Sequence, residues 1–254
     1  MNAALSALRE AWLAEEREAF SGWDFSHIAD RIVEDSPPWD YLGMAQALMP
    51  SSASMLDVDT GGGERLLDLR DHWPAKVVAS EGYPPNVAVA RERLTPFGVE
   101  VVEMDANSPR YDGLSDNQFD LVINRHGAFN AAELTRILTR GGVFLTQQVH
   151  GLSTLDLLAH FAATSKFPDA TYENATEKQR SAGLQITGGA DWTGAFVVRD
   201  VGALVYYLKA LPWLVPDFSV ETHFVELLAL QQWLEGGEQL VFGKRLYWLE
   251  ARAT

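Results

Sequence analysis

The chain contains no cysteine. Disulfide bonds, thiol nucleophiles and thiolate metal ligands are therefore excluded. It also has no apolar run of the length that a membrane span requires, so we expect no membrane association. Its first residues show no basic stretch followed by an apolar core. We therefore expect no signal peptide, and a cytoplasmic location is the default expectation.

Basic residues are scarce. Lys and Arg total 20 against 35 Asp and Glu, which gives a formal net charge of −15, and they form no cluster along the chain. Such a protein repels phosphate backbones and anionic lipid, so a nucleic-acid partner is disfavoured and a small molecule is favoured. Histidines outside the motifs described below lack metal-ligand spacing, and no metal site is expected.

The 254 residues suffice for one large α/β domain with a full core. The first fifty residues have helical spacing, with a stop at Ser21-Gly22. Strand–helix alternation follows, which predicts a parallel sheet with right-handed crossovers. The expected strands are 55–58, 76–80, 99–104, 119–124, 143–149, 183–190 and a final strand or hairpin over 240–251. The expected helices are 64–70, 85–95, 130–139, 152–164, 200–211 with Asp200 as N-cap, and 220–234.

Residues 55–63, Met-Leu-Asp-Val-Asp-Thr-Gly-Gly-Gly, are the most informative segment. An apolar strand runs into a glycine turn, and a helix follows. Glycines let the backbone approach a ligand closely, and the helix start offers free N–H groups. A dinucleotide fingerprint needs a third glycine where Leu66 stands, which disfavours a nicotinamide oxidoreductase. A phosphate-binding P-loop needs Gly-Lys-Ser/Thr, whereas Glu64-Arg65 follow the glycines here.

Acidic residues end the first three strands of this alternation. Asp57 ends the first, Glu81 directly follows the second and Asp105 directly follows the third. Parallel strands align their carboxyl ends along one crevice, so these side chains should converge there. At those positions Glu81 can accept hydrogen bonds from both hydroxyls of a ribose, and Asp105 can meet the exocyclic amine of an adenine.

From about residue 54 to 149 the chain resembles the class I S-adenosylmethionine-dependent methyltransferases. The family's first motif, acid-x-Gly-x-Gly-x-Gly, matches 57–63 with one exception. Its ribose-binding acid falls on Glu81, its adenine-side acid on Asp105 and its fourth-strand motif on Asn124-Arg125-His126-Gly127. Residues 141–144 are similar to the family's turn into strand five, and 245–250 resemble its last strand.

This resemblance implies a Rossmann-like, seven-stranded, mostly parallel sheet with helices on both faces and an antiparallel last strand. It implies a single domain over 1–254, made of an N-terminal helical cap (1–50), a cofactor-binding half (51–150) and a substrate-side half (151–254). The implied activity is methyl transfer from S-adenosylmethionine to an O or N atom of a small-molecule acceptor by direct displacement. The implied cofactor-binding residues are Asp57, Asp59, Thr60, Gly61, Gly63, Glu81, Gly82, Asp105, Ala106, Asn124 and Arg125.

Asp59 is the exception, because the family usually has its first glycine there. Asp tolerates a left-handed backbone better than most residues, so the turn can survive. Three interpretations are open: the side chain turns away and hydrogen-bonds local backbone, it binds the cofactor's ammonium group, or it impairs binding. The last keeps an alternative function open, that of a non-catalytic protein that binds S-adenosylmethionine or its demethylated product, S-adenosylhomocysteine, as a sensor or partner subunit.

His126 is the candidate catalytic residue, because it follows the fourth strand at the usual edge of the methyl-transfer site in this family. Its ordinary pKa suits a general base. The alternative is that it only lines the pocket and that catalysis is positioning alone. Gln147, Gln148 and His150 end the fifth strand, where they either face substrate or satisfy loop backbone.

Overall fold

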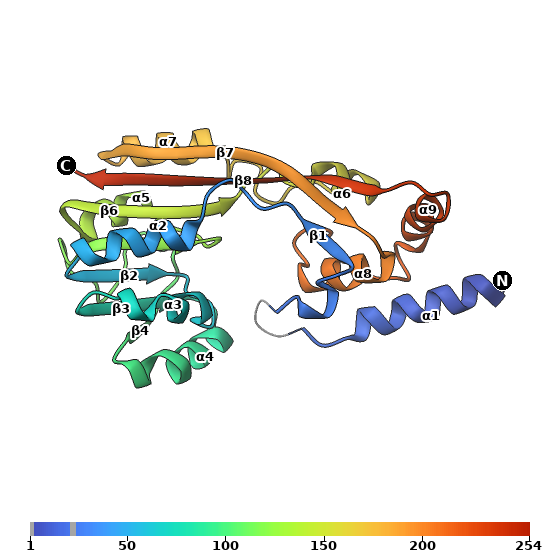
Figure 1. Cartoon of the computed structure of the whole chain (residues 1–254), viewed down its shortest axis with the longest axis horizontal. Helices are drawn as coiled ribbons and strands as arrows, with labels where there is room; N and C mark the ends of the chain where they lie inside the picture. Colours follow the sequence, from blue (N-terminus) through green and yellow to red (C-terminus); the bar gives the residue numbers. More distant parts are fainter. Residues whose placement is uncertain (1–2, 21–23) are drawn as a thin grey trace. The chain divides into compact units, whose positions relative to one another are not determined.

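The computed structural model describes residues 3–20 and 24–254. They form one eight-stranded sheet of order β1-β7-β8-β6-β5-β2-β3-β4 (Figure 1). The strands are β1 (Ile32–Glu34), β2 (Ser54–Val58), β3 (Lys76–Glu81), β4 (Glu100–Glu103), β5 (Phe119–Arg125), β6 (Leu138–Val149), β7 (Leu184–Val198) and β8 (Leu240–Ala253). The helices are α1 (Ala3–Arg17), α2 (Tyr41–Leu48), α3 (Glu64–Asp68), α4 (Pro84–Leu94), α5 (Ala131–Ile137), α6 (Leu155–His160), α7 (Tyr172–Ser181), α8 (Val201–Ala210) and α9 (Phe224–Glu235).

The chain divides into two compact units. The sheet unit comprises Pro38–His150, Ala170–Trp192 and Leu246–Thr254, and the helical unit comprises Met1–Pro37, Gly151–Asp169 and Thr193–Arg245. The strands β7 and β8 each contribute residues to both units.

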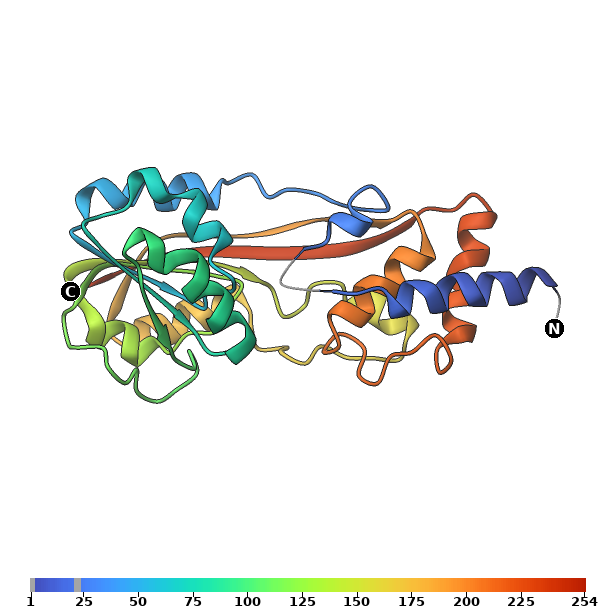
Figure 2. The ribbon, with the colours of Figure 1, turned by 90° about the horizontal axis from the view of Figure 1, so that it is seen from below.

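In the sheet unit, β2 pairs in parallel with β3 and β5, and parallel pairing continues from β3 to β4 and from β5 to β6. Alternate residues of each strand face opposite sides. Met55 lies in the buried cluster that includes Tyr41 of α2 and Leu94 of α4, whereas Leu56 lies in the cluster that includes Leu134 of α5. Helices therefore cover both faces, with α2 (blue) and α5 (yellow-green) on opposite sides in Figure 2.

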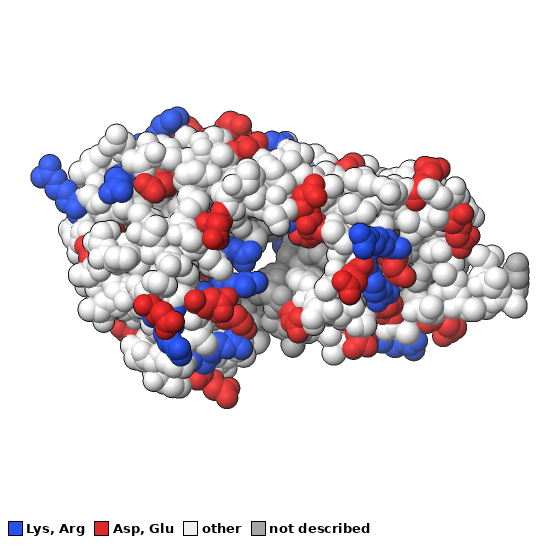
Figure 3. Space-filling model, viewed as in Figure 1, with Lys and Arg blue, Asp and Glu red and all other residues white. Residues whose placement is uncertain are grey.

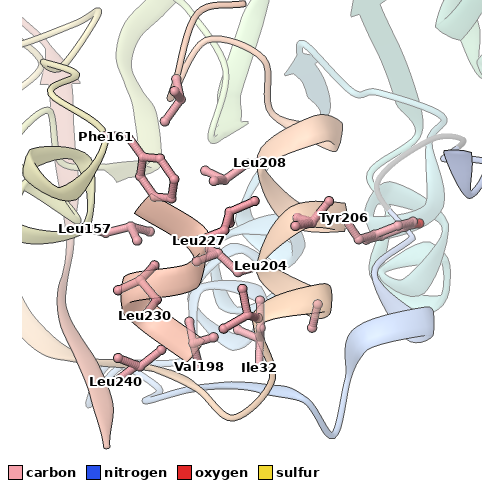
Figure 4. Close-up of a cluster of buried hydrophobic side chains, with 14 of the residues drawn as sticks. Ile32, Leu157, Phe161, Val198, Leu204, Tyr206, Leu208, Leu227, Leu230 and Leu240 are labelled. Atoms are coloured by element: carbon pink, nitrogen blue, oxygen red, sulfur yellow. The ribbon is translucent and has the colours of Figure 1, made fainter. Parts of the chain in front are cut away.

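The helical unit has its own apolar core. Side chains from α6, α8 and α9 pack together with residues of α1, β1 and β7, among them Leu157, Leu204 and Leu227 (Figure 4). Helix α8 begins as predicted, because the Asp200 carboxylate accepts a hydrogen bond from the Ala203 N–H at 2.7 Å.

The predicted count of seven strands is wrong, and the additional strand is β1. Ile32–Glu34 lies among the first fifty residues, where we expected helices, and it pairs antiparallel with residues 196–198 of β7. Three residues are too few to give a period-2 pattern, so the pairing is decided by the distant partner strand. The predicted antiparallel last strand is confirmed, since β8 runs antiparallel to β6.

Several element boundaries differ from the predicted ones. Strand β6 begins at Leu138, ahead of a register shift that takes in Gly141, whose φ is +79°. Strand β7 extends to Val198, and α6 is shorter than the predicted helix over 152–164. Helix α1 ends at Arg17, and the stop expected at Ser21-Gly22 lies outside the described residues. Within 3–20 and 24–254, no helix is long and apolar enough to cross a membrane.

Candidate functional site

The glycine turn links β2 to α3. Three of its residues adopt the left-handed backbone: Asp59 at φ +54°, Gly61 at +63° and Gly63 at +81°. The Thr60 N–H donates to the Ser80 carbonyl at 2.9 Å, which fixes the turn to the end of β3. A Cβ on Gly63 would lie 2.7 Å from the Leu94 side chain, so the turn packs closely on α4.

Glu81 is the last residue of β3 and is 6% exposed. One carboxylate oxygen accepts from the Gly61 N–H at 2.7 Å, and the other accepts from the Tyr83 N–H at 2.8 Å. Each oxygen of an ionised carboxylate has two acceptor positions. Glu81 therefore braces the turn and still has capacity for two further donors, such as the hydroxyls of a ribose.

The ends of β3 and β4 lie side by side. A Cβ on Gly82 would lie 3.1 Å from the Met104 carbonyl oxygen and 3.2 Å from the Asp105 Cα. Asp105 is exposed, and its carboxylate accepts from the Asn107 N–H at 2.8 Å. The adjacent Ala106 is buried. The close approach therefore brings the loop that carries Asp105 next to the loop that follows Glu81.

These carboxylates act on one another. Burial raises the pKa of Asp57 to about 7, with Asp59 and Glu81 adding to the shift, although the Thr60 hydroxyl donates to Asp57 at 2.7 Å. Burial likewise raises the pKa of Asp59 to about 6, and Glu81 and Asp105 raise it further. Acidic groups are thus concentrated at the carboxyl ends of β2, β3 and β4, and a cationic ligand there would favour their ionised forms.

Asp59 is hydrogen-bonded, but not to local backbone. Its carboxylate accepts from the Ala128 N–H at 2.9 Å, in the loop between β5 and α5. A Cβ on the preceding Gly127 would lie 2.5 Å from the Asp59 Cβ and 3.0 Å from the Asn124 amide nitrogen. Asp59 therefore joins the glycine turn to this loop, and the contact requires glycine at 127.

Asn124, at the end of β5, is fully buried. Its amide nitrogen donates to the carbonyls of Val58 and Ala128 at 3.0 and 3.2 Å, and its amide oxygen accepts from Thr146 and Gln148. All four hydrogen-bonding positions of the side chain are filled. Asn124 thus ties β2, β5 and β6 together, with no side-chain position left for a cofactor.

Arg125 and His126 are exposed at the end of β5. His126 has φ +59°, and its N–H donates to the Gln147 carbonyl at 2.8 Å. The Gln147 side-chain amide contacts the His126 Nε2 at 3.0 Å. His126 therefore lies beside the last residues of β6. The residues that follow it in the loop, Gly127 and Ala128, contact Asp59.

The structure brings together most of the residues singled out in the sequence. Those gathered at the carboxyl ends of the parallel strands are Asp57, Asp59, Thr60, Gly61, Gly63, Glu81, Gly82, Asp105, Ala106, Asn124, Arg125 and His126. The sequence did not assign the roles of three supporting residues. Tyr41 donates its hydroxyl to the Asn124 carbonyl at 2.9 Å, Trp39 donates to Gln147, and Thr146 donates to Asn124. Only the folding of the chain brings these three residues close to Asn124 and Gln147.

Comparisons with known proteins find similarity to methyltransferases. Residues 56–146 match a family model described as a methyltransferase domain. The demethylmenaquinone methyltransferase of Thermus thermophilus is 32% identical over 112 residues, which cover 41% of this chain and 50% of that protein. The chain therefore matches about half the length of this curated relative.

Solved structures share the fold. A candidate methyltransferase from Bacillus halodurans C-125 is 20% identical, with a TM-score of 0.57 over 84% of this chain and 97% of that one. The [4+2]-cyclase SpnF is 16% identical, with a TM-score of 0.51 over 84% and 80% of the two chains. Residues 56–146 thus match a methyltransferase domain, and the solved structures share the fold of the chain. The cyclase shows that the fold alone does not determine the reaction.

Proposed function

We propose that this protein transfers a methyl group from S-adenosylmethionine to an O or N atom of a small-molecule acceptor. The observation that carries the proposal is the arrangement around Glu81. A buried carboxylate with spare acceptor positions braces a glycine turn at the carboxyl ends of β2 and β3. The name of the Thermus relative, a demethylmenaquinone methyltransferase, supports a small-molecule acceptor.

The residues present fit this cofactor. Glu81 would accept hydrogen bonds from the ribose hydroxyls, and Asp105 would meet the adenine amine from the neighbouring loop. Asp57 and Asp59, whose carboxyls burial and neighbouring acids make hard to ionise, would be stabilised in the charged form by a sulfonium cation. When bound, the cofactor supplies an activated methyl group on that sulfonium.

On the acceptor side, the chain's own contribution is to hold the nucleophile in line with the methyl group and to exclude water. His126 is the residue we assign to contact the acceptor, since it is exposed at the end of β5. On the face drawn in Figure 3, Lys and Arg are interspersed with Asp and Glu, which does not favour a nucleic-acid site on that face.

The rival function is binding without catalysis, and Asp59 is the observation that favours it. Its carboxylate occupies the turn where the family usually has glycine, and it is already hydrogen-bonded to Ala128. The test is to incubate the protein with S-adenosylmethionine labelled in its methyl group and a panel of hydroxyl, amine and quinone-type acceptors. Labelled product supports the proposal. Binding by calorimetry without transfer to any acceptor favours the rival, and absence of binding contradicts both.

A further inference from the structure

Three side chains of the sheet unit form a hydrogen-bonded series that ends on His126. The Trp39 indole Nε1 donates to the Gln147 Oε1 at 2.7 Å. The Gln147 Nε2 then lies 3.0 Å from the His126 Nε2. Trp39 precedes α2, Gln147 lies in β6 and His126 follows β5, so three separate segments of the unit meet here.

Trp39 determines, through Gln147, which ring nitrogen of His126 carries the proton. An indole N–H can only donate, so the atom of Gln147 that faces Trp39 must be the amide oxygen. The amide nitrogen, also a donor, must then face His126. A donor facing the His126 Nε2 requires a lone pair there, and a neutral imidazole with a lone pair on Nε2 carries its proton on Nδ1.

The surroundings hold this arrangement in place. Gln147 is 5% exposed, so its amide cannot turn over freely to solvent. Its carbonyl also accepts the His126 main-chain N–H at 2.8 Å, which anchors the residue that bears the ring. Trp39 packs against the buried cluster on the α2 face and meets Trp192 edge-on, with ring centroids 6.4 Å apart.

We propose that Trp39 and Gln147 are positioning residues that hold His126 as the Nδ1–H tautomer. His126 then presents a hydrogen-bond donor at Nδ1, and its Nε2 is not available to take a proton from an acceptor. For Nε2 to accept a proton, the ring must leave Gln147, or the Gln147 amide must turn over and lose Trp39. The placement of His126 beside the methyl acceptor rests on the proposed function, whereas the tautomer does not.

The experiment is nitrogen NMR of the full chain with ¹⁵N-labelled histidine, at neutral pH and without cofactor. His126→Asn identifies the His126 ring signals by their loss. In the wild-type protein, Nδ1 is expected in the protonated range of chemical shift and Nε2 in the unprotonated range. A ring with its proton on Nε2, or a doubly protonated ring, would overturn the proposal.

Variants test whether the two positioning residues cause this state. In Gln147→Glu one carboxylate oxygen can still accept from Trp39, while the other requires a donor at Nε2, so the Nε2 signal is expected to move to the protonated range. Trp39→Phe keeps an aromatic ring but removes the N–H donor, and a mixture of tautomers is expected. Trp73→Phe is the matched control, because its N–H donates elsewhere, to the Leu66 carbonyl at 3.1 Å.

An unchanged Nε2 signal in both Gln147→Glu and Trp39→Phe would contradict the role of the pair. None of these measurements uses the cofactor. If the expected tautomer is present but no methyl transfer occurs, the result counts against the proposed function alone. If methyl transfer occurs but the expected tautomer is absent, the result counts against this inference alone.

Discussion

Asp59 and Gly127 occupy complementary positions: a side chain at 59 is accommodated only because there is none at 127. A Cβ on Gly127 would come within 2.5 Å of the Asp59 Cβ. The Asp59 Cβ is attached directly to the backbone of the glycine turn, so it cannot move aside as the tip of a long side chain would.

Gly127→Ala is therefore expected to destabilise the protein by about 1–3 kcal/mol, as overpacking does. In an Asp59→Gly background the same substitution should cost less than half as much, since φ +54° suits glycine and the clashing atom is gone. Urea unfolding of the wild type, the two single variants and the double variant gives the coupling free energy between positions 59 and 127. Gly243→Ala, whose Cβ would have only an ordinary 3.8 Å contact, is the control. Equal costs in both backgrounds would contradict the pairing.

Glu81→Ala is expected to weaken S-adenosylmethionine binding at least about tenfold, because each lost hydrogen bond to a charged acceptor is worth about 1.5–3 kcal/mol. Titration calorimetry measures the effect, and circular dichroism checks that the variant folds, because Glu81 also holds Gly61 and Tyr83. Glu103→Ala is the matched control, since Glu103 is opposite Glu81 in the β3–β4 register but exposed. Unchanged affinity in the Glu81 variant would remove it from the site.

The contribution of Asp57 and Asp59 to the stability of the unliganded protein should fall as pH rises through the range of about 4 to 7. Asp57 and Asp59 have native pKa values of about 7 and about 6, above the ordinary 3.8, so the native state binds more protons than the unfolded state there. Denaturation in urea at several pH values measures how the free energy of unfolding changes with pH. Asp57→Asn should reduce this change, while Asp112→Asn at an exposed site should not. The same pH dependence in the wild type and in Asp57→Asn would contradict the assignment.

The same charges should favour the cofactor over its demethylated product, which lacks the sulfonium. One carboxylate about 8 Å from that cation contributes roughly 2 kcal/mol before salt screening. We expect S-adenosylmethionine to bind more tightly as pH rises past the pKa values of Asp59 and Asp57, with a smaller change for the product. Calorimetry with both compounds at low salt tests this. Equal affinities for the two compounds would rule out this preference. Asp59→Asn should reduce the difference between the two affinities.

Features encoded locally could be predicted from the sequence. The strand that ends at Asp57–Val58, the glycine turn and the Asp200 N-cap each depend on a few consecutive residues, and the structure confirms them. The convergence of Glu81 and Asp105 followed from one topological rule about parallel strands.

Contacts between distant segments could not be predicted. The hydroxyl of Tyr41 reaches Asn124 across 83 positions, and the Asp59 carboxylate reaches Ala128 across 69. No spacing or periodicity in the sequence predicts such a pair. Strand β1 was not predicted for the same reason, because its three residues form a strand only through their pairing with β7.

The antiparallel pairing of β6 with β8 has a consequence for anyone who expresses part of this gene. The family match ends at residue 146, inside β6, yet seven residues from 143 to 149 pair with 246–252, near the other end of the polypeptide. A fragment cut at the apparent domain border would leave the edge of β6 that pairs with β8 unpaired, as an open template for self-association. The border drawn by sequence similarity is not a border for folding.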